Sequence, residues 1–227
     1  IRGSGVSDQS FAVSEIRVAT GSSFLTKDHE HKISTGVSAV KVLRYLAEEG
    51  KCTEACRYEK SFVCLAAEWK DSTKECKLFD RPTSTFTAQT GTTHREVDIP
   101  TTCEDILTRG GAENGKYFIK PRGLPTPIEV YCDLSSPTGP WTVIQRRVNG
   151  DVDFQKSWDH YKNGFGDLSG NFWLGNENIH KLTQMGNFQL RVKLCKASGE
   201  CSHATYNSFF IDGEESSKYG YKLHVGG

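Results

Sequence analysis

The 227-residue chain lacks several features that mark large classes of proteins. Its 28 basic and 28 acidic side chains cancel, so no excess of positive charge is available for a broad nucleic-acid surface. Its longest apolar run, Phe62 to Ala67, is far shorter than the roughly 18 residues that a membrane-spanning helix needs. We therefore predict a protein that does not bind nucleic acid and has no membrane span.

Motifs that carry catalysis are also missing. The chain has no G-x-S-x-G, no glycine-rich phosphate loop and no H-E-x-x-H. Every cysteine can be given a disulfide partner, so none stands out as a thiol nucleophile. We predict no catalytic residue, no enzyme activity and no cofactor within this sequence.

Cysteine, in contrast, is abundant. Eight cysteines are unusual for a cytosolic protein of this length, and the absence of any Cys-x-x-Cys pair disfavours structural zinc. The chain begins at Ile1 without an apolar signal segment, which we interpret as a mature secreted chain or an excised piece of one. We predict an extracellular, secreted protein with disulfides. The cysteines form three groups: Cys52, Cys56, Cys64 and Cys76; Cys103 and Cys132; Cys195 and Cys201.

A stretch rich in threonine and serine, Pro82 to Thr102, separates the first cysteine group from the second. We interpret it as a solvated linker, with a last edge strand at Ser84–Thr87 as an alternative for part of it. The predicted domains are residues 1–99, with this linker at the end, and residues 100–227.

The first predicted domain combines strands with one helix. Phe11–Val18 alternates as a strand does, whereas the apolar residues of Val37–Leu46 fit a helix and a strand equally well. Thr53–Tyr58 is predicted to be a short helix with Thr53 as its N-cap. Val63–Trp69 and Cys76–Phe79 are predicted to be two strands joined by a polar hairpin loop.

The spacing of the first four cysteines fits this arrangement. Cys52 and Cys56 are four residues apart and share one helix face, while Cys64 and Cys76 lie on paired strands. Nested bridges would join the helix to the hairpin, but four cysteines allow three connectivities and the spacing does not choose among them. A four-cysteine zinc site is a further alternative.

A helix with Cys-x-x-x-Cys followed by "FVCLAAEW" and "ECKLF" resembles a PAN/apple domain. The resemblance implies a small antiparallel sheet with one helix, and it implies the bridges Cys52–Cys76 and Cys56–Cys64. The family's third bridge, which ties the ends of the domain together, has no cysteines in this sequence.

The second predicted domain has clearer strand patterns. Phe188–Leu194 alternates apolar and polar residues, which is typical of a half-buried strand, and Asn149-Gly150 marks a turn. Glu177–Gln184 is predicted to be a helix. Further strands are predicted at Lys116–Lys120, Ile128–Cys132 and Trp141–Arg147, and around Tyr221, Leu223 and Val225.

The segments "NGKYFIKP", "IEVYCDL", "WTVIQRRVNGDVDFQKSWDHYKNGFG" and "NFWLGNENIHKLT" together resemble a fibrinogen C-terminal, or fibrinogen-related, domain. The resemblance implies a disulfide between Cys103 and Cys132 and tight backbone at Gly164, Gly166 and Gly175. It also implies a set of core aromatic residues: Trp141, Phe154, Trp158, Tyr161, Phe165, Phe172 and Trp173. Cys195 and Cys201 are an extra pair, and the five residues between them predict a local bridge over a turn.

The same resemblance implies that only the first part of such a domain lies before Gly227. In the family, the acidic calcium loop, a second disulfide and the ligand pocket follow the pattern Y-x-L-x-V-G. No ligand-binding residue is therefore assigned, and calcium is expected only if a C-terminal half exists. The family's last strand also returns into the central sheet, so this half alone would leave a strand edge unpaired. Either the sequence is a fragment of a longer chain whose remainder is not recorded, or an oligomer or partner chain supplies the missing piece.

Two acidic or histidine-containing segments are candidate metal sites. The run Asp28–His31 could hold a metal, but a solvated loop is the better interpretation, and Asp151 with Asp153 fits a structural turn better than a metal site. No metal site is therefore predicted.

Two further features are candidate binding surfaces. Arg146 and Arg147, with Lys116, Lys120 and Arg122, fit a patch for sulfated glycans and equally well a set of exposed strand charges. Trp69 could be a binding platform, but packing behind the disulfides is the better interpretation.

The predicted fold class is α+β: a small disulfide-stapled PAN/apple-like sheet with one helix, followed by an incomplete fibrinogen-like α+β domain. The predicted function is a secreted, non-enzymatic, lectin-like recognition or adhesion protein that binds glycans or extracellular proteins through its tandem modules. The alternative is a structural subunit of an extracellular matrix, filament or large complex.

Overall fold

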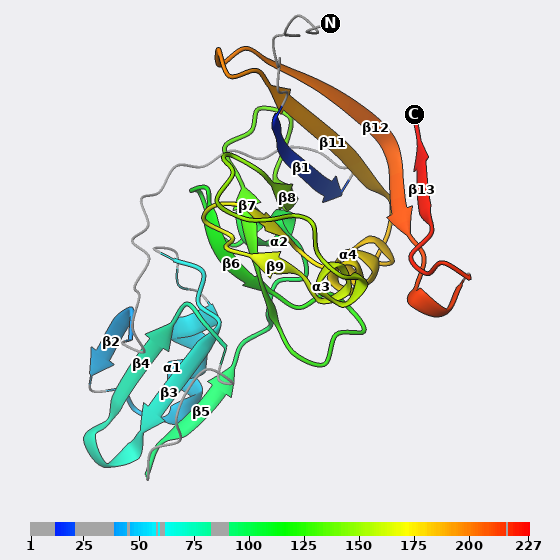
Figure 1. Ribbon diagram of the computed structural model, residues 1–227. Helices are drawn as coiled ribbons and strands as arrows, with labels where there is room; N and C mark the ends of the chain where they lie inside the picture. The colour runs from blue at the N-terminus through cyan, green and yellow to red at the C-terminus, as the bar shows by residue number, and fades with distance from the viewer. Residues whose placement is uncertain are drawn as a thin grey trace, which may run out of the picture. The chain divides into compact units, whose positions relative to one another are not determined.

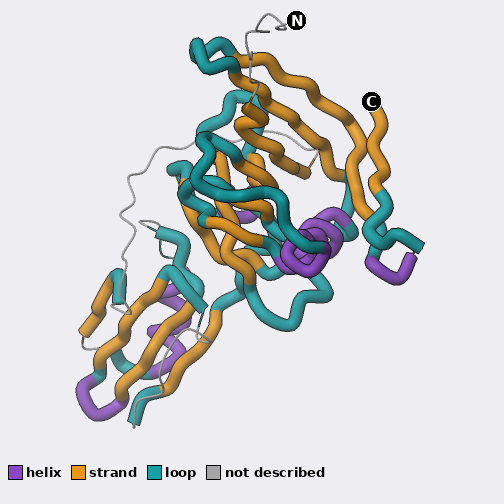
Figure 2. The backbone as a smooth tube through the Cα atoms, in the orientation of Figure 1, coloured by secondary structure: helices purple, strands orange, loops and turns teal. Residues whose placement is uncertain are grey.

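The computed structural model describes residues 12–20, 39–44, 46–57, 59, 62–82, 91–216 and 218–227. Figure 1 shows the protein as ribbons, and Figure 2 shows that strands predominate over short helices, so the fold class is α+β. The protein forms two compact units, Ile1–Gly21 with Thr142–Gly227 and Ser22–Trp141. This division differs from the predicted domains, because the first segments after residue 100 belong to the same unit as the PAN-like sheet.

The unit Ser22–Trp141 contains a four-stranded antiparallel sheet in the order β2-β4-β3-β5. The strands are β2 (Lys41–Arg44), β3 (Ala66–Lys70), β4 (Glu75–Phe79) and β5 (Thr93–Glu96). Lys41–Arg44 settles the ambiguity of the 37–46 segment in favour of a strand. β5 lies inside the predicted linker, where no strand was expected at this position, whereas the alternative edge strand at Ser84–Thr87 falls outside the described residues.

The helix α1 (Glu49–Arg57) packs on this sheet through one face. Cys52 and Cys56 are both buried on that face, as their spacing of four residues predicted. Glu49 in the first turn and Arg57 in the last turn match the helix dipole. The prediction that Thr53 caps the helix is wrong, because Thr53 lies in the second turn.

The same unit continues into the start of the fibrinogen-like sequence. It comprises α2 (Cys103–Thr108), β6 (Gly115–Ile119) and β7 (Ile128–Asp133), of which β6 and β7 form an antiparallel hairpin. Thr102 caps α2 by accepting a hydrogen bond from the backbone N–H of Asp105, and the Asp105 carboxylate accepts in return from Thr101. These reciprocal bonds fix where the backbone enters the helix.

The other unit is built on an antiparallel sheet in the order β13-β12-β11-β1-β8-β10-β9. Its strands are β1 (Ala12–Thr20), β8 (Trp141–Arg146), β9 (Phe165–Gly166), β10 (Phe172–Trp173), β11 (Phe188–Cys195), β12 (Cys201–Ile211) and β13 (Leu223–Gly226). Its helices are α3 (Trp158–Asn163), α4 (Asn176–Thr183) and the short 3-10 helix η3 (Glu214–Ser216). No helix among the described residues is long and apolar enough to cross a membrane.

The N-terminal strand β1 is the main departure from the expected organisation. The sequence predicted a strand here but assigned it to the first domain. The structure places it between β8 and β11, inside the sheet of the fibrinogen-like half (Figure 1). β1 therefore has a strand partner on each side.

Two of the predicted tight glycines show why only glycine fits there. Gly164 and Gly166 have φ values of 90° and 91°, a region that disfavours side chains. A Cβ atom would approach backbone oxygens to 2.7 Å at Gly164 and 2.1 Å at Gly166. The prediction of tight backbone is confirmed at these positions.

The predicted aromatic core is only partly buried. Trp141 and Phe172 are each 1 % exposed, whereas Trp158 is 48 % exposed, so the core prediction is wrong for Trp158. The other four residues are half-buried and lie in ring contact, with centroid distances between 5.0 and 5.6 Å for three pairs. They are Phe154, Tyr161, Phe165 and Trp173.

Four disulfides join all eight cysteines. The pairs are Cys52–Cys76, Cys56–Cys64, Cys103–Cys132 and Cys195–Cys201. The first three are the pairs that the family resemblances imply, and the last is the local bridge predicted over a turn. Because the first four sulfurs are joined in pairs, the alternative of a four-cysteine zinc site does not describe this fold. Trp69 is 4 % exposed and packs with the first two bridges, as the structural interpretation of this residue predicted.

Candidate functional site

The unit that contains β1 has an apolar hollow with a volume of about 270 Å³. Ligand pockets are often of this order or larger, and are lined mainly by apolar side chains with a few polar groups. The hollow is lined by Ile144, Trp173, Asn176, Ile179, Leu190, Phe209, Ile211, Tyr221 and Leu223. We call this set the apolar hollow.

Strand alternation and one amphipathic helix build the hollow. Phe209 and Ile211 are two residues apart on β12, so their side chains lie on the same face of the sheet. Leu190 on β11 contributes to the same cavity. The helix α4 packs against β12 and turns Ile179 inward, where it is 1 % exposed.

Tyr221 closes one side of the hollow. Its hydroxyl donates a hydrogen bond to Glu177 Oε2 at 2.8 Å, and its ring lies 5.9 Å from that of Trp158. Tyr221 has a φ of 38°, a left-handed conformation that is uncommon for an aromatic residue. A bulky residue keeps this conformation only where its surroundings hold it in place, and here the contacts with Glu177 and Trp158 do so.

Ionised groups surround this side of the hollow. Glu214 accepts hydrogen bonds from Lys162 and from Trp158. The bond from Lys162 lowers the pKa of Glu214 most, and the bond from Trp158 lowers it further. Burial works against ionisation of Glu177, but the hydrogen bond from Tyr221 and the charge of Lys181 lower its pKa overall. Both carboxylates are therefore ionised at neutral pH and serve to hold the rim rather than to exchange protons.

Exposed apolar side chains lie beside the hollow. Leu223, which lines it, is 56 % exposed, and Val225 on the same strand is 47 % exposed. β13 ends the strand order of its sheet, so within the described residues one of its edges has no neighbouring strand. Exposed apolar side chains beside an open strand edge are typical of interaction surfaces.

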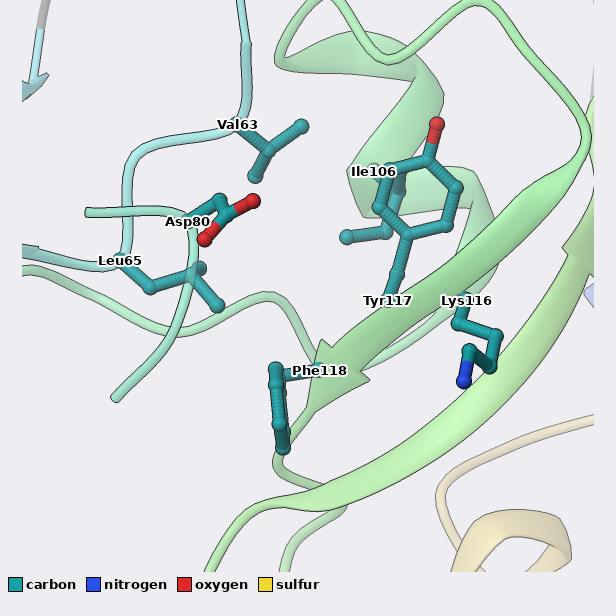
Figure 3. A pocket seen from close by; sticks show the side chains of 7 residues that line it. All are labelled: Val63, Leu65, Asp80, Ile106, Lys116, Tyr117 and Phe118. Atoms are coloured by element: carbon teal, nitrogen blue, oxygen red, sulfur yellow. The ribbon is translucent and has the colours of Figure 1, made fainter. Parts of the chain in front are cut away.

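A second, smaller cavity lies in the unit Ser22–Trp141 (Figure 3). Its volume of about 30 Å³ is enough for a water molecule and too small for a larger ligand. Val63, Leu65 and Asp80 line it from the PAN-like part, and Ile106 with Lys116–Phe118 line it from α2 and β6. We interpret it as a packing defect where these segments meet.

The metal candidates do not form a site in the described part of the protein. No group of three or more His, Cys, Asp or Glu side chains suited to a metal occurs there. The Asp151 carboxylate accepts a hydrogen bond from the Asn149 side-chain amide, and the Asp151 backbone N–H donates one to Asn149 Oδ1. Asp153 accepts one from the backbone N–H of Gln155, so these are contacts of a structural turn. The run Asp28–His31 lies outside the described residues.

The basic residues that were weighed as a glycan patch do not all belong to one unit. Arg146 lies over the Phe172 ring at 5.9 Å, and Arg147 lies over the Phe154 ring at 4.4 Å. These contacts give both arginines packing roles in their own unit. The remaining members of the set, Lys116, Lys120 and Arg122, belong to the other unit.

The sequence predicted the elements around the hollow better than the hollow itself. The predicted pattern at Tyr221, Leu223 and Val225 corresponds to the rim and to β13. Phe209 and Ile211 were not predicted as site residues, because β12 was not recognised as a strand. The sequence signal that indicates a strand there is the pair of apolar residues Phe209 and Ile211, which are two positions apart.

The fold defines a class: a disulfide-stabilised α+β module of the kind found in extracellular proteins. The protein belongs to the fibrinogen family, because residues 99–227 match the model of the C-terminal globular domain of the fibrinogen beta and gamma chains. Residues 26–102 match the PAN domain model. Membership in this family of binding proteins and the four disulfides are consistent with a secreted recognition or matrix protein.

Relatives and solved structures match just over half of this chain. Fibrinogen-like protein A of Apostichopus parvimensis is 44% identical over 125 residues, which are 54% of this chain and 44% of that protein. Microfibril-associated glycoprotein 4 of Mus musculus is 41% identical over 130 residues, which are 56% of this chain and 51% of that protein. The chain thus spans about half the length of the curated relatives it matches.

Two solved structures have a similar fold. The fibrinogen-like globe domain of human ANGPTL2 has a TM-score of 0.54 and 39% identity, over 56% of this chain and 58% of that chain. Lamprey fibrin D-dimer, complexed with the peptide ligand Gly-His-Arg-Pro-amide, has a TM-score of 0.52 and 35% identity, over 56% of this chain and 39% of that chain.

Proposed function

We propose that this protein is a secreted, non-enzymatic recognition or adhesion protein whose fibrinogen-like half binds an extracellular protein partner at the apolar hollow. The observation that carries the proposal is the coincidence of three features: a cavity of about 270 Å³, the exposed side chain of Leu223 at its opening, and the open edge of β13. An extended peptide segment with an apolar side chain matches all three features.

The chemistry of the lining favours an apolar side chain over a sugar. Apolar atoms dominate the lining, and the indole N–H of Trp173 already donates to the Tyr161 carbonyl at 2.9 Å and to Asn176 at 3.1 Å. A glycan would have to lose hydrogen bonds to water without replacements at such a surface. A protein partner is therefore the first candidate, with glycans as the alternative.

The similar proteins support the same class of partner. The lamprey fibrin structure contains a peptide ligand, and one curated relative is named for its association with microfibrils. Several modules in one protein also allow weak individual contacts to add up by avidity.

A charge at the opening tests the proposal. A phage-displayed random peptide library selected on the complete protein is expected to yield sequences with a shared apolar residue. Leu223→Asp should weaken the selected peptides by about tenfold or more, because an aspartate would have to be desolvated against the bound apolar group.

Val148→Asp is the matched control, because Val148 is 60 % exposed, comparable to the 56 % of Leu223, but does not line the hollow. This variant should bind the selected peptides as the unaltered protein does. Equal loss in both variants, or no selected sequence at all, would count against the hollow as the binding site. Binding to acetylated sugars on a glycan array that survives Leu223→Asp would instead support the glycan alternative.

A second candidate function is a structural subunit of an extracellular matrix, filament or large complex. The specific observation in its favour is the open edge of β13 at the end of the sheet. Sedimentation analysis of the 25.3 kDa protein separates the two candidates. A monomer at all concentrations argues against the structural role and leaves the peptide-binding proposal untouched.

A further inference from the structure

The disulfide at the end of the β11–β12 hairpin carries an inference that is independent of the hollow. We propose that Cys195–Cys201 is a site of thiol–disulfide exchange, at which a small thiol compound opens the bond and becomes covalently attached to Cys201. The other three disulfides of the protein do not undergo this reaction in the folded state. The site gives the protein a reversible covalent attachment point for thiols.

Exposure separates this disulfide from the others. Cys201 is exposed and Cys195 is half-buried, whereas the six remaining cysteines are between 0 % and 7 % exposed. A thiolate must reach a sulfur atom before it can exchange with a disulfide, so access limits the rate of the reaction. At the three buried bonds, access requires the surrounding structure to open first. Cys195–Cys201 can therefore react while the fold stays intact.

The surroundings of this bond are open as well. The first eight residues of β12, Cys201–Ser208, are all exposed, and so is the turn from Lys196 to Glu200. Figure 1 shows this turn at one end of the sheet, away from α3 and α4. An incoming thiol can thus approach Cys201 from solvent without displacing a buried side chain.

Contacts that do not involve sulfur hold the hairpin in register. Cys195 and Cys201 are opposite each other as the last pair of the β11–β12 ladder. Across the turn, the Lys196 backbone N–H donates to the Glu200 carbonyl at 2.8 Å, and the Lys196 ammonium group forms an ion pair with the Glu200 carboxylate at 2.7 Å. These contacts remain when the disulfide opens, so the two cysteines stay close together.

The exchange is chemically balanced between its two reactants. The incoming thiolate forms a bond to Cys201 Sγ, and the bond between Cys201 Sγ and Cys195 Sγ breaks. Cys195 Sγ leaves with the bonding electron pair as a thiolate, which takes up a proton in place of the one that the incoming thiol released. One sulfur–sulfur bond replaces another, so no external oxidant or reductant is needed.

The different exposure of the two cysteines determines which sulfur is attacked. Cys201 is the more exposed of the two, so the mixed disulfide forms there. Because Cys195 remains opposite Cys201 in the ladder, its thiolate can attack the mixed disulfide and expel the attached thiol. The attachment is therefore reversible, and its extent increases with the concentration of the thiol.

Exchange with glutathione under native conditions tests the proposal. The complete protein is incubated with reduced glutathione, and an alkylating reagent stops the reaction at early times by blocking released thiols. Lys196 lies between the two cysteines, so trypsin places them on different peptides. We expect mass spectrometry to find glutathione on the Cys201 peptide and the alkylating reagent on the Cys195 peptide.

Cys56–Cys64 is the matched control within the same protein. It closes a sequence separation of 8, close to the 6 of Cys195–Cys201, but its cysteines are only 2 % and 7 % exposed. Exchange at this bond should be about tenfold slower or more, because it requires local opening. In urea that unfolds the protein, the two rates should become similar, because the difference in exposure is lost.

Three results would overturn the proposal. They are exchange at Cys56–Cys64 as fast as at Cys195–Cys201 in the folded protein, no exchange at Cys195–Cys201 until the protein unfolds, and glutathione found first on the Cys195 peptide. The double variant Cys195→Ser, Cys201→Ser should form no adduct under native conditions, and an adduct there would place the exchange at another bond. The peptide-binding experiment above is unaffected by these results, because it depends on Leu223.

Discussion

At the scale of single residues, Tyr221 links the hollow to the charges around it. Its side chain forms part of the cavity wall, while its hydroxyl donates to Glu177 at 2.8 Å. Burial, and then the carboxylate of Glu177, raise the pKa of Tyr221 above its ordinary value, so the hydroxyl keeps its proton under all physiological conditions. The bond is therefore a permanent donor contact to an ionised acceptor.

Tyr221→Phe should destabilise the unit by about 1.5 kcal/mol at pH 7, the low end of the range for a hydrogen bond to a charged group, because this pair is only partly buried. The pKa of Glu177 lies below its ordinary value of 4.5, so its contribution to stability is present above that pH and is lost as the pH falls through the lowered value. The cost of Tyr221→Phe should accordingly be smaller at pH 3 than at pH 7, as measured by urea unfolding at the two pH values.

Tyr117→Phe is the control for the pH effect. The Tyr117 hydroxyl donates to the backbone carbonyl of Glu113 at 2.9 Å, and burial raises the pKa of Tyr117 to about 12. Neither partner titrates between pH 3 and pH 7, so the loss from this substitution should not depend on pH. A cost of Tyr221→Phe that is the same at both pH values would mean that the charge of Glu177 adds nothing to this bond.

At the scale of elements, the sequence predicted strands whose apolar residues alternate, such as β11, and strands that are buried on both faces, such as β3 and β8. β11 alternates clearly and was predicted almost to its ends. β12 was missed because its first eight residues are exposed, which leaves no apolar period for most of its length. β5 was missed because it is a short edge strand in a segment rich in threonine.

The hollow could not be predicted because it depends on packing between elements. α4 was predicted, and the positions of Leu223 and Val225 were recognised as a strand pattern. Local patterns do not reveal how α4 lies on β12, nor that side chains from β8 and β11 face the same cavity. The partner strands of β1 were unpredictable for the same reason, because an alternating strand fits any sheet with a free edge.

The disulfides should contribute unequally to stability. Cys195–Cys201 closes a sequence separation of 6, whereas Cys103–Cys132 closes one of 29. Loop-closure entropy predicts a loss of about 2 kcal/mol when both cysteines of the shorter bridge are replaced by serine, and roughly 3–4 kcal/mol for the longer one. Cys103 and Cys132 are also buried, which adds lost packing to the second value.

Urea unfolding of the two double variants measures this order. The serine variant of Cys103 and Cys132 should have the lower midpoint, and the slope of the transition should stay unchanged if the folded state is the same. The reverse order would mean that the bridge at the end of the β11–β12 hairpin holds more structure than its short loop and partly exposed position suggest.

At the scale of the whole molecule, sequence modules and compact units divide the protein differently. The family matches meet between residues 99 and 102, but α2, β6 and β7 belong to the unit that contains the PAN-like sheet. β1 is separated from its own sheet in the sequence and yet belongs to it in the fold. A truncation designed from the family boundaries would therefore cut through one unit and remove a central strand from the other.

Removal of residues 1–20 should disturb the strands on either side of β1 selectively. Amide hydrogens of β8 and β11 are expected to exchange about tenfold faster or more, since their opening no longer requires β1 to leave. Amides of β3 and β4 should keep their protection, because these strands belong to the other compact unit. Hydrogen exchange followed by mass spectrometry resolves the two regions in one experiment.

Removal of residues 1–11 alone is the control, because it leaves the whole of β1 (Ala12–Thr20) in place. That variant should show ordinary protection in β8 and β11. Unchanged exchange after removal of residues 1–20 would mean that β8 and β11 close directly on each other. Faster exchange in β3 and β4 as well would mean that the two units unfold together, in which case the N-terminal strand stabilises the entire molecule rather than one sheet.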